Sequence, residues 1–303
     1  MALPLFPPES DPGPDFVGLL RQAGNISFTR DSSSAGSGNG GSRNHGGGPA
    51  GSPEAGFAGA PHATTVVALR YAEGVIMAGD RRATMGNIIA HRSMEKVFAA
   101  DRYSAVAIAG SAGMAVEMVR LFQVQLEHYE KVEGTALSLE GKANQLAQMV
   151  RQNLPLAMQG LVVVPLFAGY DTARGIGRIF SYDATGGHYE DADFQSTGSG
   201  GRDARSTIKL GWREGLSRDE AVDLAIQSLY DAADEDSATG GPDLVRGIYP
   251  LIAVVDAEGY RLVAEEEVAE RFGALIARRR AEQSADAAER AEQGNRPEGG
   301  RAQ

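Results

Sequence analysis

Two adjacent threonines, Thr64 and Thr65, open the first strand-like stretch of the sequence, HATTVVALRYAEGVIMAGD. A threonine hydroxyl is a poor nucleophile unless a base lies beside it, and a threonine at the start of a chain carries that base as its own α-amine. This amine has a pKa of about 7.7 to 8.0, so much of it is neutral near pH 7. Cleavage between Ala63 and Thr64 would turn a non-basic amide nitrogen into such a base. On composition alone, the alternative is that the threonines only begin a strand.

Two charged residues, Asp80 and Lys96, lie in segments where half-buried strands would prefer apolar side chains. Asp80 ends the apolar run GVIMAGD, and Lys96 lies inside SMEKVF. A buried cation and a buried anion are expected to pair. A lysine held beside the threonine amine would disfavour a second positive charge, which lowers the pKa of the amine and stabilises the threonine alkoxide. The alternative is a surface salt bridge across a hairpin, which stabilises by only about 0 to 1 kcal/mol.

Other catalytic and metal-binding motifs are absent from the sequence. It has no G-x-S-x-G elbow, no H-E-x-x-H helix and no Walker phosphate loop. A formal G-x-G-x-x-G match at residues 36–41 lies in a glycine tract without a strand before it or a helix after it, so chance explains it. Zero cysteines exclude disulfides and thiolate nucleophiles. A zinc cluster or a Ser-His-Asp triad could form only in space, because the histidines are scattered. They are His45, His62, His91, His128 and His188.

The composition is that of a globular protein with an acidic surface. The chain has 303 residues, a hydrophobic content of 42% and a formal net charge of -11. This charge argues against nucleic-acid binding, which needs clustered Lys and Arg. The longest mostly apolar run, residues 160–170, is far shorter than the ~20 residues of a membrane helix. The N-terminus lacks the basic and apolar regions of a secretory signal. Together with the lack of cysteine, these features predict a cytoplasmic protein without a membrane partner.

Three regions are predicted along the chain. Residues 1–63 are rich in Gly, Ser, Asn and Pro, so they bury too little apolar area to offset the entropy of ordering. We expect them to be a disordered propeptide that is removed on maturation. Residues 64–270 form the predicted catalytic domain, and residues 271–303 form a charged helical end and a flexible tail.

Strand-like and helix-like segments alternate in two rounds within the predicted domain. Strands are predicted at 65–71, 75–78, 88–98, 105–109, 161–169, 177–182 and 189–196, with a final hairpin at 248–255 and 260–263. Helices are predicted at 114–129, 139–154 and 202–212, and another begins at a capping box formed by Ser217 and Glu220. This order predicts an α+β domain in which two sheets pack together and helices cover their outer faces.

Four blocks of the sequence carry a resemblance to a known family. They are TTVVALRYAEGVIMAGDRRATMGNIIAHRSMEKVF from residue 64, IAGSAG at 108–113, GSG at 198–200 and DSATGG at 236–241. In this order and spacing they resemble the catalytic β-subunit of the 20S proteasome, with the actinobacterial branch most similar. The resemblance spans residues 64–263. It implies the N-terminal nucleophile hydrolase fold, a four-layer αββα sandwich, which agrees with the predicted order of elements.

The resemblance also implies roles for individual residues. Thr64 is the nucleophile and its freed amine is the base, because Asp80 and Lys96 follow it by the sixteen and thirty-two residues that the family shows. Thr65 is one residue out of register. Asp80 pairs with Lys96, which tunes the amine. The remaining catalytic residues are a backbone N–H donor for the oxyanion and a supporting hydroxyl and carboxylate network, implied at Gly110, Ser199, Asp236 and Thr239.

A substrate pocket beside the nucleophile is implied as well, and it is apolar in character. We therefore expect cleavage after large hydrophobic residues. The implied substrate-binding residues are Ala83, Thr84, Met94, Phe98, Ile108, Ala112 and Val116. Two residues depart from the family pattern: Ala63 stands before the cut where glycine is usual, and Thr239 stands where many relatives have serine.

The family implies an assembly without metal or cofactor. Two homo-heptameric β-rings lie between two rings of α-subunits in an α7β7β7α7 core, a regulatory AAA ATPase feeds the chamber, and a small ubiquitin-like protein tags substrates. One alternative is the simpler, six-membered-ring bacterial ATP-dependent threonine protease, whose subunits are much shorter and lack the DSATGG block in this context. Another is a non-catalytic scaffold subunit of the same ring, which would typically lose the threonine or the lysine that this chain keeps.

Overall fold

The computed structural model describes residues 64–85 and 88–294. The predicted propeptide, which ends at Ala63, lies outside the described residues. So do residues 295–303 of the predicted tail. Among the residues that the structure describes, no helix combines the length and the apolar character that a membrane span requires.

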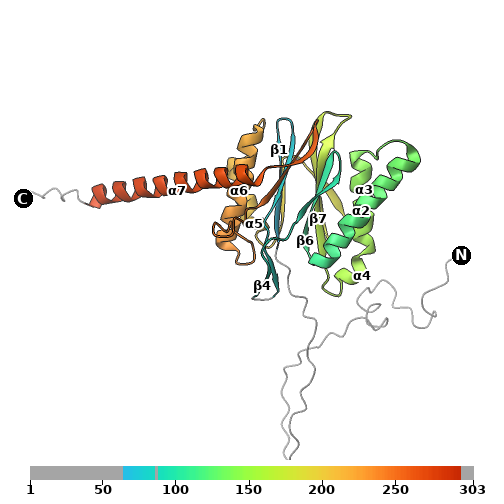
Figure 1. Cartoon of the computed structure of the whole chain (residues 1–303), viewed down its shortest axis with the longest axis horizontal. Coiled ribbons are helices and arrows are strands. Elements are labelled where there is room, and N and C mark those ends of the chain that lie inside the picture. Colours follow the sequence, from blue (N-terminus) through green and yellow to red (C-terminus); the bar gives the residue numbers. More distant parts are fainter. Residues whose placement is uncertain (1–63, 86–87, 295–303) are drawn as a thin grey trace, which may run out of the picture. The chain divides into compact units, whose positions relative to one another are not determined.

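Two five-stranded antiparallel sheets form the centre of the described part (Figure 1). The first has the order β10-β1-β2-β11-β12, and the second has the order β5-β6-β7-β8-β9. The strands of the first sheet are β1 (Thr65–Tyr71), β2 (Gly74–Gly79), β10 (Phe194–Gly198), β11 (Leu251–Asp256) and β12 (Gly259–Leu262). Those of the second are β5 (Val97–Asp101), β6 (Ser104–Gly110), β7 (Val163–Asp171), β8 (Ile176–Tyr182) and β9 (His188–Asp191). A separate hairpin consists of β3 (Ala83–Met85) and β4 (Ile88–His91).

Helices cover the outer face of each sheet (Figure 1). The helices on the second sheet are α2 (Ala112–Glu133) and α3 (Leu139–Gln152), which the short α4 (Leu154–Ala157) follows. Those on the side of the first sheet are α5 (Gly201–Gly211), α6 (Arg218–Glu235) and α7 (Glu265–Gly294). The order of layers is therefore helix, sheet, sheet, helix, and the predicted four-layer αββα sandwich is confirmed.

The alternation of side chains along β1 explains why the sheets need cover on both faces. Val66 and Ala68 lie in the apolar cluster between the two sheets. Val67 and Leu69 point the other way and lie in the cluster that includes Ala225 and other residues of α6. Because successive side chains of a strand alternate between faces, an uninterrupted apolar run predicts a strand that is buried on both sides. These four residues of β1 are all fully buried.

One predicted strand is wrong in its extent. The segment 88–98 was predicted as a single strand, but β4 ends at His91 and β5 begins at Val97. Between them, the backbone N–H of Met94 donates to the carbonyl of Arg81 at 2.9 Å. The chain therefore leaves the β3–β4 hairpin and enters the second sheet, which places Lys96 at the junction.

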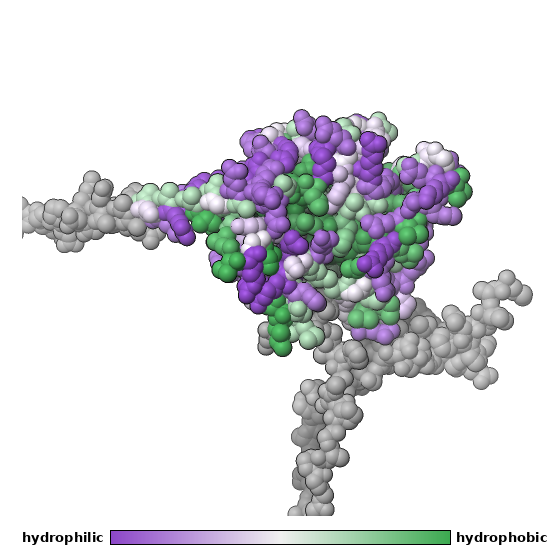
Figure 2. All heavy atoms as spheres, in the orientation of Figure 1, coloured by the Kyte–Doolittle hydropathy of each residue, from purple (hydrophilic) through white to green (hydrophobic). Residues whose placement is uncertain are grey.

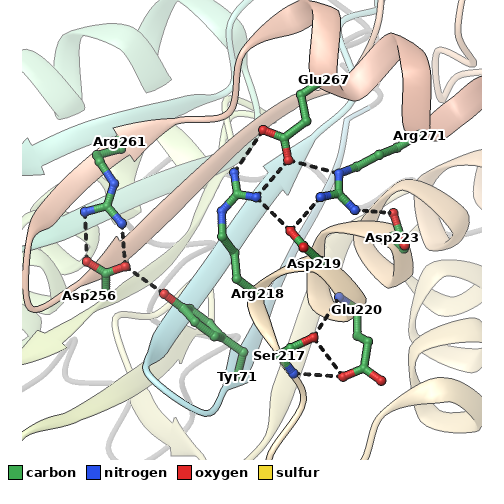
Figure 3. Close-up of polar contacts among 10 residues, drawn as sticks. All are labelled: Tyr71, Ser217, Arg218, Asp219, Glu220, Asp223, Asp256, Arg261, Glu267 and Arg271. Carbon is green, nitrogen blue, oxygen red and sulfur yellow. Dashed lines mark hydrogen bonds and ion pairs between the residues drawn. The ribbon is translucent and has the colours of Figure 1, made fainter.

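The junction of α6 and α7 is held by charged side chains (Figure 3). The predicted capping box is confirmed, since Ser217 accepts from the Glu220 N–H and the Glu220 carboxylate accepts from the Ser217 N–H. Arg218 pairs with Glu267 at 2.7 Å, and Arg271 pairs with Asp219, Asp223 and Glu267. Because these partners are partly or largely exposed, each pair contributes little to stability.

The β3–β4 hairpin presents apolar side chains to solvent. Apolar atoms gather where this hairpin projects (Figure 2). Met85 and Ile88, on its two strands, are 59% and 65% exposed. Exposed apolar groups of this kind at a projecting hairpin are typical of a surface that other protein covers.

Candidate active site

Thr64 lies directly before β1 and is held there by the end of β10. Its carbonyl accepts a hydrogen bond from the Ser199 N–H at 2.9 Å. A Cβ at Gly198 would lie 1.7 Å from the same carbonyl oxygen, and Gly198 has φ of 102°. Only glycine allows this close approach and this backbone angle. The GSG block therefore fixes the position of Thr64, which is 6% exposed.

Asp80 lies opposite Thr65 because β1 and β2 are antiparallel neighbours with Val66 paired to Gly79. The Asp80 N–H donates to the Thr65 carbonyl at 3.1 Å, and the Thr65 N–H donates to Asp80 Oδ1 at 2.8 Å. The other carboxylate oxygen, Oδ2, accepts from the N–H groups of Arg82 at 2.9 Å and Gly240 at 2.8 Å. Asp80 thus joins three segments of the chain.

Lys96 pairs with Asp80 inside the protein. Its Nζ lies 2.6 Å from Asp80 Oδ1 and donates to the Arg82 carbonyl at 2.5 Å. The side chains of Lys96 and Asp80 are 3% and 0% exposed. Burial lowers the pKa of the Lys96 ammonium below its ordinary value, although the nearby Asp80 carboxylate acts in the opposite direction.

Ser199, Asp236 and Thr239 form a second polar cluster. Both hydroxyls donate to Asp236 Oδ2, Ser199 at 2.5 Å and Thr239 at 2.6 Å. Burial raises the pKa of Asp236, but these hydrogen bonds outweigh it and hold the pKa below its ordinary value. Asp236 is therefore an ionised acceptor. The loop that carries it is tied to the first cluster through the bond from the Gly240 N–H to Asp80.

Gly110 ends β6 with a backbone that requires glycine. Its φ is 116°, and a Cβ there would lie 2.1 Å from the carbonyl oxygen of Val162. Gly110 lines the same cavity as Thr64 and Lys96. The structure therefore brings Thr64, the buried Lys96 and the Gly110 backbone, which carries no side chain, to one cavity.

Apolar residues make up most of the wall of this cavity. The predicted lining residues found there are Ala83, Met94, Phe98, Ile108, Ala112 and Val116. Thr84 was predicted to bind substrate as well, but it is not among the residues that line the cavity. Two lining residues were missed, Glu95 and Ala115. Ala115 is one helical turn from Ala112, a spacing that could have identified it.

The sheets, their outer helices and a threonine beside a buried lysine define the class of N-terminal nucleophile hydrolases. A family model described as proteasome subunit matches residues 60–245. "Proteasome subunit beta" of Acidimicrobium ferrooxidans is 60% identical over 271 residues, which cover 89% of this chain and 92% of the relative. "Proteasome subunit beta" of Streptomyces griseus subsp. griseus is 59% identical over 220 residues, which cover 73% and 78%. The chain belongs to the proteasome subunit family.

These relatives confirm the resemblance and the predicted role as a β-type subunit of the proteasome core. They do not favour the six-membered-ring protease or the non-catalytic scaffold. A subunit of this family is part of a protease and assembles with other proteasome subunits.

Proposed function

We propose that this chain is a threonine endopeptidase subunit of a 20S proteasome core, with the Thr64 hydroxyl as its nucleophile once residues 1–63 have been removed. The observation that carries the proposal is the buried Lys96–Asp80 pair, whose lysine borders the same cavity as Thr64. A buried ion pair alone is weak evidence of catalysis, so the proposal rests on the position of its lysine in the wall of the cavity that Thr64 also lines.

The propeptide determines when the base becomes available. In the uncut chain the nitrogen of Thr64 belongs to an amide and cannot take a proton. Cleavage of the Ala63–Thr64 bond frees an α-amine, which can accept the hydroxyl proton as Thr64 Oγ attacks. The positive charge of Lys96 disfavours protonation of this amine, so a fraction of the amine stays neutral near pH 7. Residues 1–63 act as a propeptide, residues 64–270 as the catalytic domain and residues 271–303 as a helical end and tail.

Peptide hydrolysis then proceeds in two steps. Thr64 Oγ attacks the substrate carbonyl, and the backbone N–H of Gly110 stabilises the oxyanion. The C–N bond breaks, the leaving amine takes the proton from the α-amine, and an ester to Thr64 remains. Water, deprotonated by the same amine, attacks the ester; the bond from the acyl carbon to Thr64 Oγ breaks, the carboxylic acid product leaves, and Thr64 Oγ takes the proton back from the amine. Ser199, Asp236 and Thr239 support the amine and the water.

The apolar cavity supports a preference for large hydrophobic residues at the position before the cut. Apolar residues form most of its wall, including Met94, Phe98 and Ile108. Glu95 adds a carboxylate to this wall, and it is an exposed residue that water can solvate.

The proposed particle is an α7β7β7α7 core made with α-subunit rings and fed by an AAA ATPase with unfolded or tagged proteins. The exposed apolar hairpin at Met85 and Ile88 supports contact with neighbouring subunits. No metal or cofactor takes part in the proposed steps, and a cytoplasmic location stays a prediction from the sequence.

The test uses the full-length chain produced together with an α-type proteasome subunit. We expect a wild-type chain whose intact mass begins at Thr64, and faster hydrolysis of peptides that end in Leu, Tyr or Phe than of those that end in Arg or Asp. Thr64→Ala should keep residues 1–63 and lose at least about a thousandfold in hydrolysis. Thr185→Ala, on the turn after β8, is the matched control and should behave as wild type. Normal cutting after Ala63 and normal hydrolysis in all-Thr64→Ala particles would contradict the proposal.

A further inference from the structure

Thr65, the second of the two threonines, has a side chain that strand formation does not require. It is 0% exposed and begins β1. Its backbone already bonds Asp80 through both the N–H and the carbonyl. Yet its hydroxyl makes two further hydrogen bonds inside the protein. It accepts from the Gly200 N–H at 3.0 Å, and its Oγ1 lies 2.6 Å from Thr239 Oγ1.

The hydrogen count sets the direction of these bonds. A threonine hydroxyl has one proton to donate. Thr239 uses its proton on Asp236 Oδ2, and the ionised Asp236 can only accept. The proton between the two threonines must therefore come from Thr65. The Gly200 N–H therefore donates to Thr65, the Thr65 hydroxyl donates to Thr239, and the Thr239 hydroxyl donates to Asp236.

The Thr65 and Thr239 hydroxyls pack closely against Gly200. A Cβ on Gly200 would lie 2.7 Å from Thr239 Oγ1 and 2.8 Å from Thr65 Oγ1. Real Cβ atoms do not approach other atoms so closely, so a side chain at Gly200 would push the two hydroxyls apart. Both threonines are fully buried, and water cannot easily replace either partner.

We infer that Thr65 is a positioning residue for the reaction under "Proposed function", on which the inference rests. It acts through Thr239. By donating to the Thr239 oxygen, Thr65 directs the Thr239 proton onto Asp236, and this holds the carboxylate in place beside Ser199. The first threonine supplies the nucleophile, and the second orders the hydrogen bonds that support it.

The test compares Thr65→Val with Thr65→Ser. If Thr65 has only a structural role, the serine variant should be the more impaired; if its hydroxyl positions Asp236, the valine variant should be. Valine keeps the shape of threonine and favours a strand, whereas serine keeps the hydroxyl and favours a strand less. If the hydroxyl positions Asp236, Thr65→Val should lower kcat per processed chain by about 10- to 100-fold with KM unchanged. Thr65→Ser should stay close to wild type. The assay uses particles formed with the α-type subunit, and intact mass counts the processed chains.

A double substitution reports whether Thr65 acts through Thr239. The double variant Thr65→Val/Thr239→Val should lose no more kcat than Thr239→Val alone. The reason is that Thr239→Val already interrupts the series of hydrogen bonds to Asp236. Multiplied losses would show that the two threonines act independently and would overturn the inference. If Thr65→Val does not assemble, Thr65→Ala replaces it, since alanine removes the hydroxyl without the bulk of valine.

The outcomes separate this inference from the proposed function. If Thr64→Ala particles are inactive and Thr65→Val keeps the wild-type kcat, only the role of Thr65 is wrong. A kcat for Thr65→Ser as low as that for Thr65→Val would also overturn it. If Thr64→Ala particles still cut peptides, the nucleophile assignment fails, whatever Thr65 does.

Discussion

Two buried lysine–aspartate pairs lie in different parts of the described structure and have nearly the same geometry. Lys96 Nζ lies 2.6 Å from Asp80, and Lys142 Nζ lies 2.5 Å from Asp101. Both lysine side chains are almost fully buried, at 3% and 6% exposure. The aspartates differ, because the Asp80 side chain is 0% exposed and that of Asp101 is 22% exposed.

The surroundings decide what each pair does. Asp101 also accepts from the Tyr103 N–H and the Ser104 hydroxyl, so its pair closes the β5–β6 turn and joins it to α3. Asp80 instead holds the start of β1 and the Gly240 loop, and its lysine faces the cavity of the proposed nucleophile. A buried ion pair is therefore no evidence of catalysis by itself. The hydroxyl and the cavity beside it make the difference.

The first prediction tests the pair at the site and has the largest expected effect. Lys96→Met should keep the propeptide attached and lower peptide hydrolysis by at least about a thousandfold, because the amine becomes more basic and the alkoxide loses its cation. Removing one partner of a buried pair also costs about 3–5 kcal/mol of stability. Peptide assays and intact mass of the particle measure the first effect, and a thermal melt measures the second. A processed and active Lys96→Met particle would contradict the role of the lysine.

The second prediction concerns the matched pair away from the site. Lys142→Met should lower stability by about 1–3 kcal/mol, less than Lys96→Met, since Asp101 is partly exposed and water can replace its partner. Processing and kcat per processed chain should be unchanged. The same melt and the same peptide assay serve here. If Lys142→Met blocked processing in assembled particles as Lys96→Met does, the distinction between the two pairs would be lost.

Much of this arrangement can be read from the sequence, and the rest depends on tertiary contacts. The spacing of Thr64, Asp80 and Lys96, supported by the family resemblance, predicts which side chains the site contains. The same reasoning does not predict that Lys142 is buried or paired, because a lysine in an amphipathic helix is normally solvated. Its pairing with Asp101 arises only when α3 packs on the second sheet.

The hydroxyl of Thr65 was missed for a similar reason. Its partners at Gly200 and Thr239 are 135 and 174 residues away in the chain. No local periodicity connects positions so far apart. The strand 88–98 was predicted too long because its apolar residues continue on both sides of the break, while the bond from Met94 to Arg81 that redirects the chain is a backbone contact without a signature in side-chain types.

The last prediction has the smallest expected effect and uses a third ionic group, Asp256 with Arg261 and Tyr71 (Figure 3). Arg261 lies 2.6 Å from Asp256 Oδ2 and is 41% exposed, and the Tyr71 hydroxyl donates to the same oxygen at 2.8 Å. Burial raises the pKa of Asp256, but the hydrogen bonds from Arg261 and Tyr71 outweigh it, so the pKa lies below its ordinary value. Because the folded protein holds this carboxyl at a lower pKa than the unfolded chain does, its contribution to stability is present above about pH 4 and is lost as the pH falls further.

Asp256→Asn should therefore lower the thermal midpoint of the full-length chain by about 2–4 °C at pH 7, as expected for a loss of about 1 kcal/mol from a partly exposed pair. The difference from wild type should shrink as the pH falls below about 4, where the wild-type carboxyl also becomes neutral. Tyr71→Phe is the matched control: it removes the neutral donor and leaves the Arg261 pair in place, so most of the pH dependence should persist. A difference between Asp256→Asn and wild type that stays constant from pH 7 to pH 3 would mean that shape, and not the charge of Asp256, stabilises this end of the sheet. Peptide hydrolysis should not change in either variant, because this group contacts neither the cavity of Thr64 nor the Asp80 network.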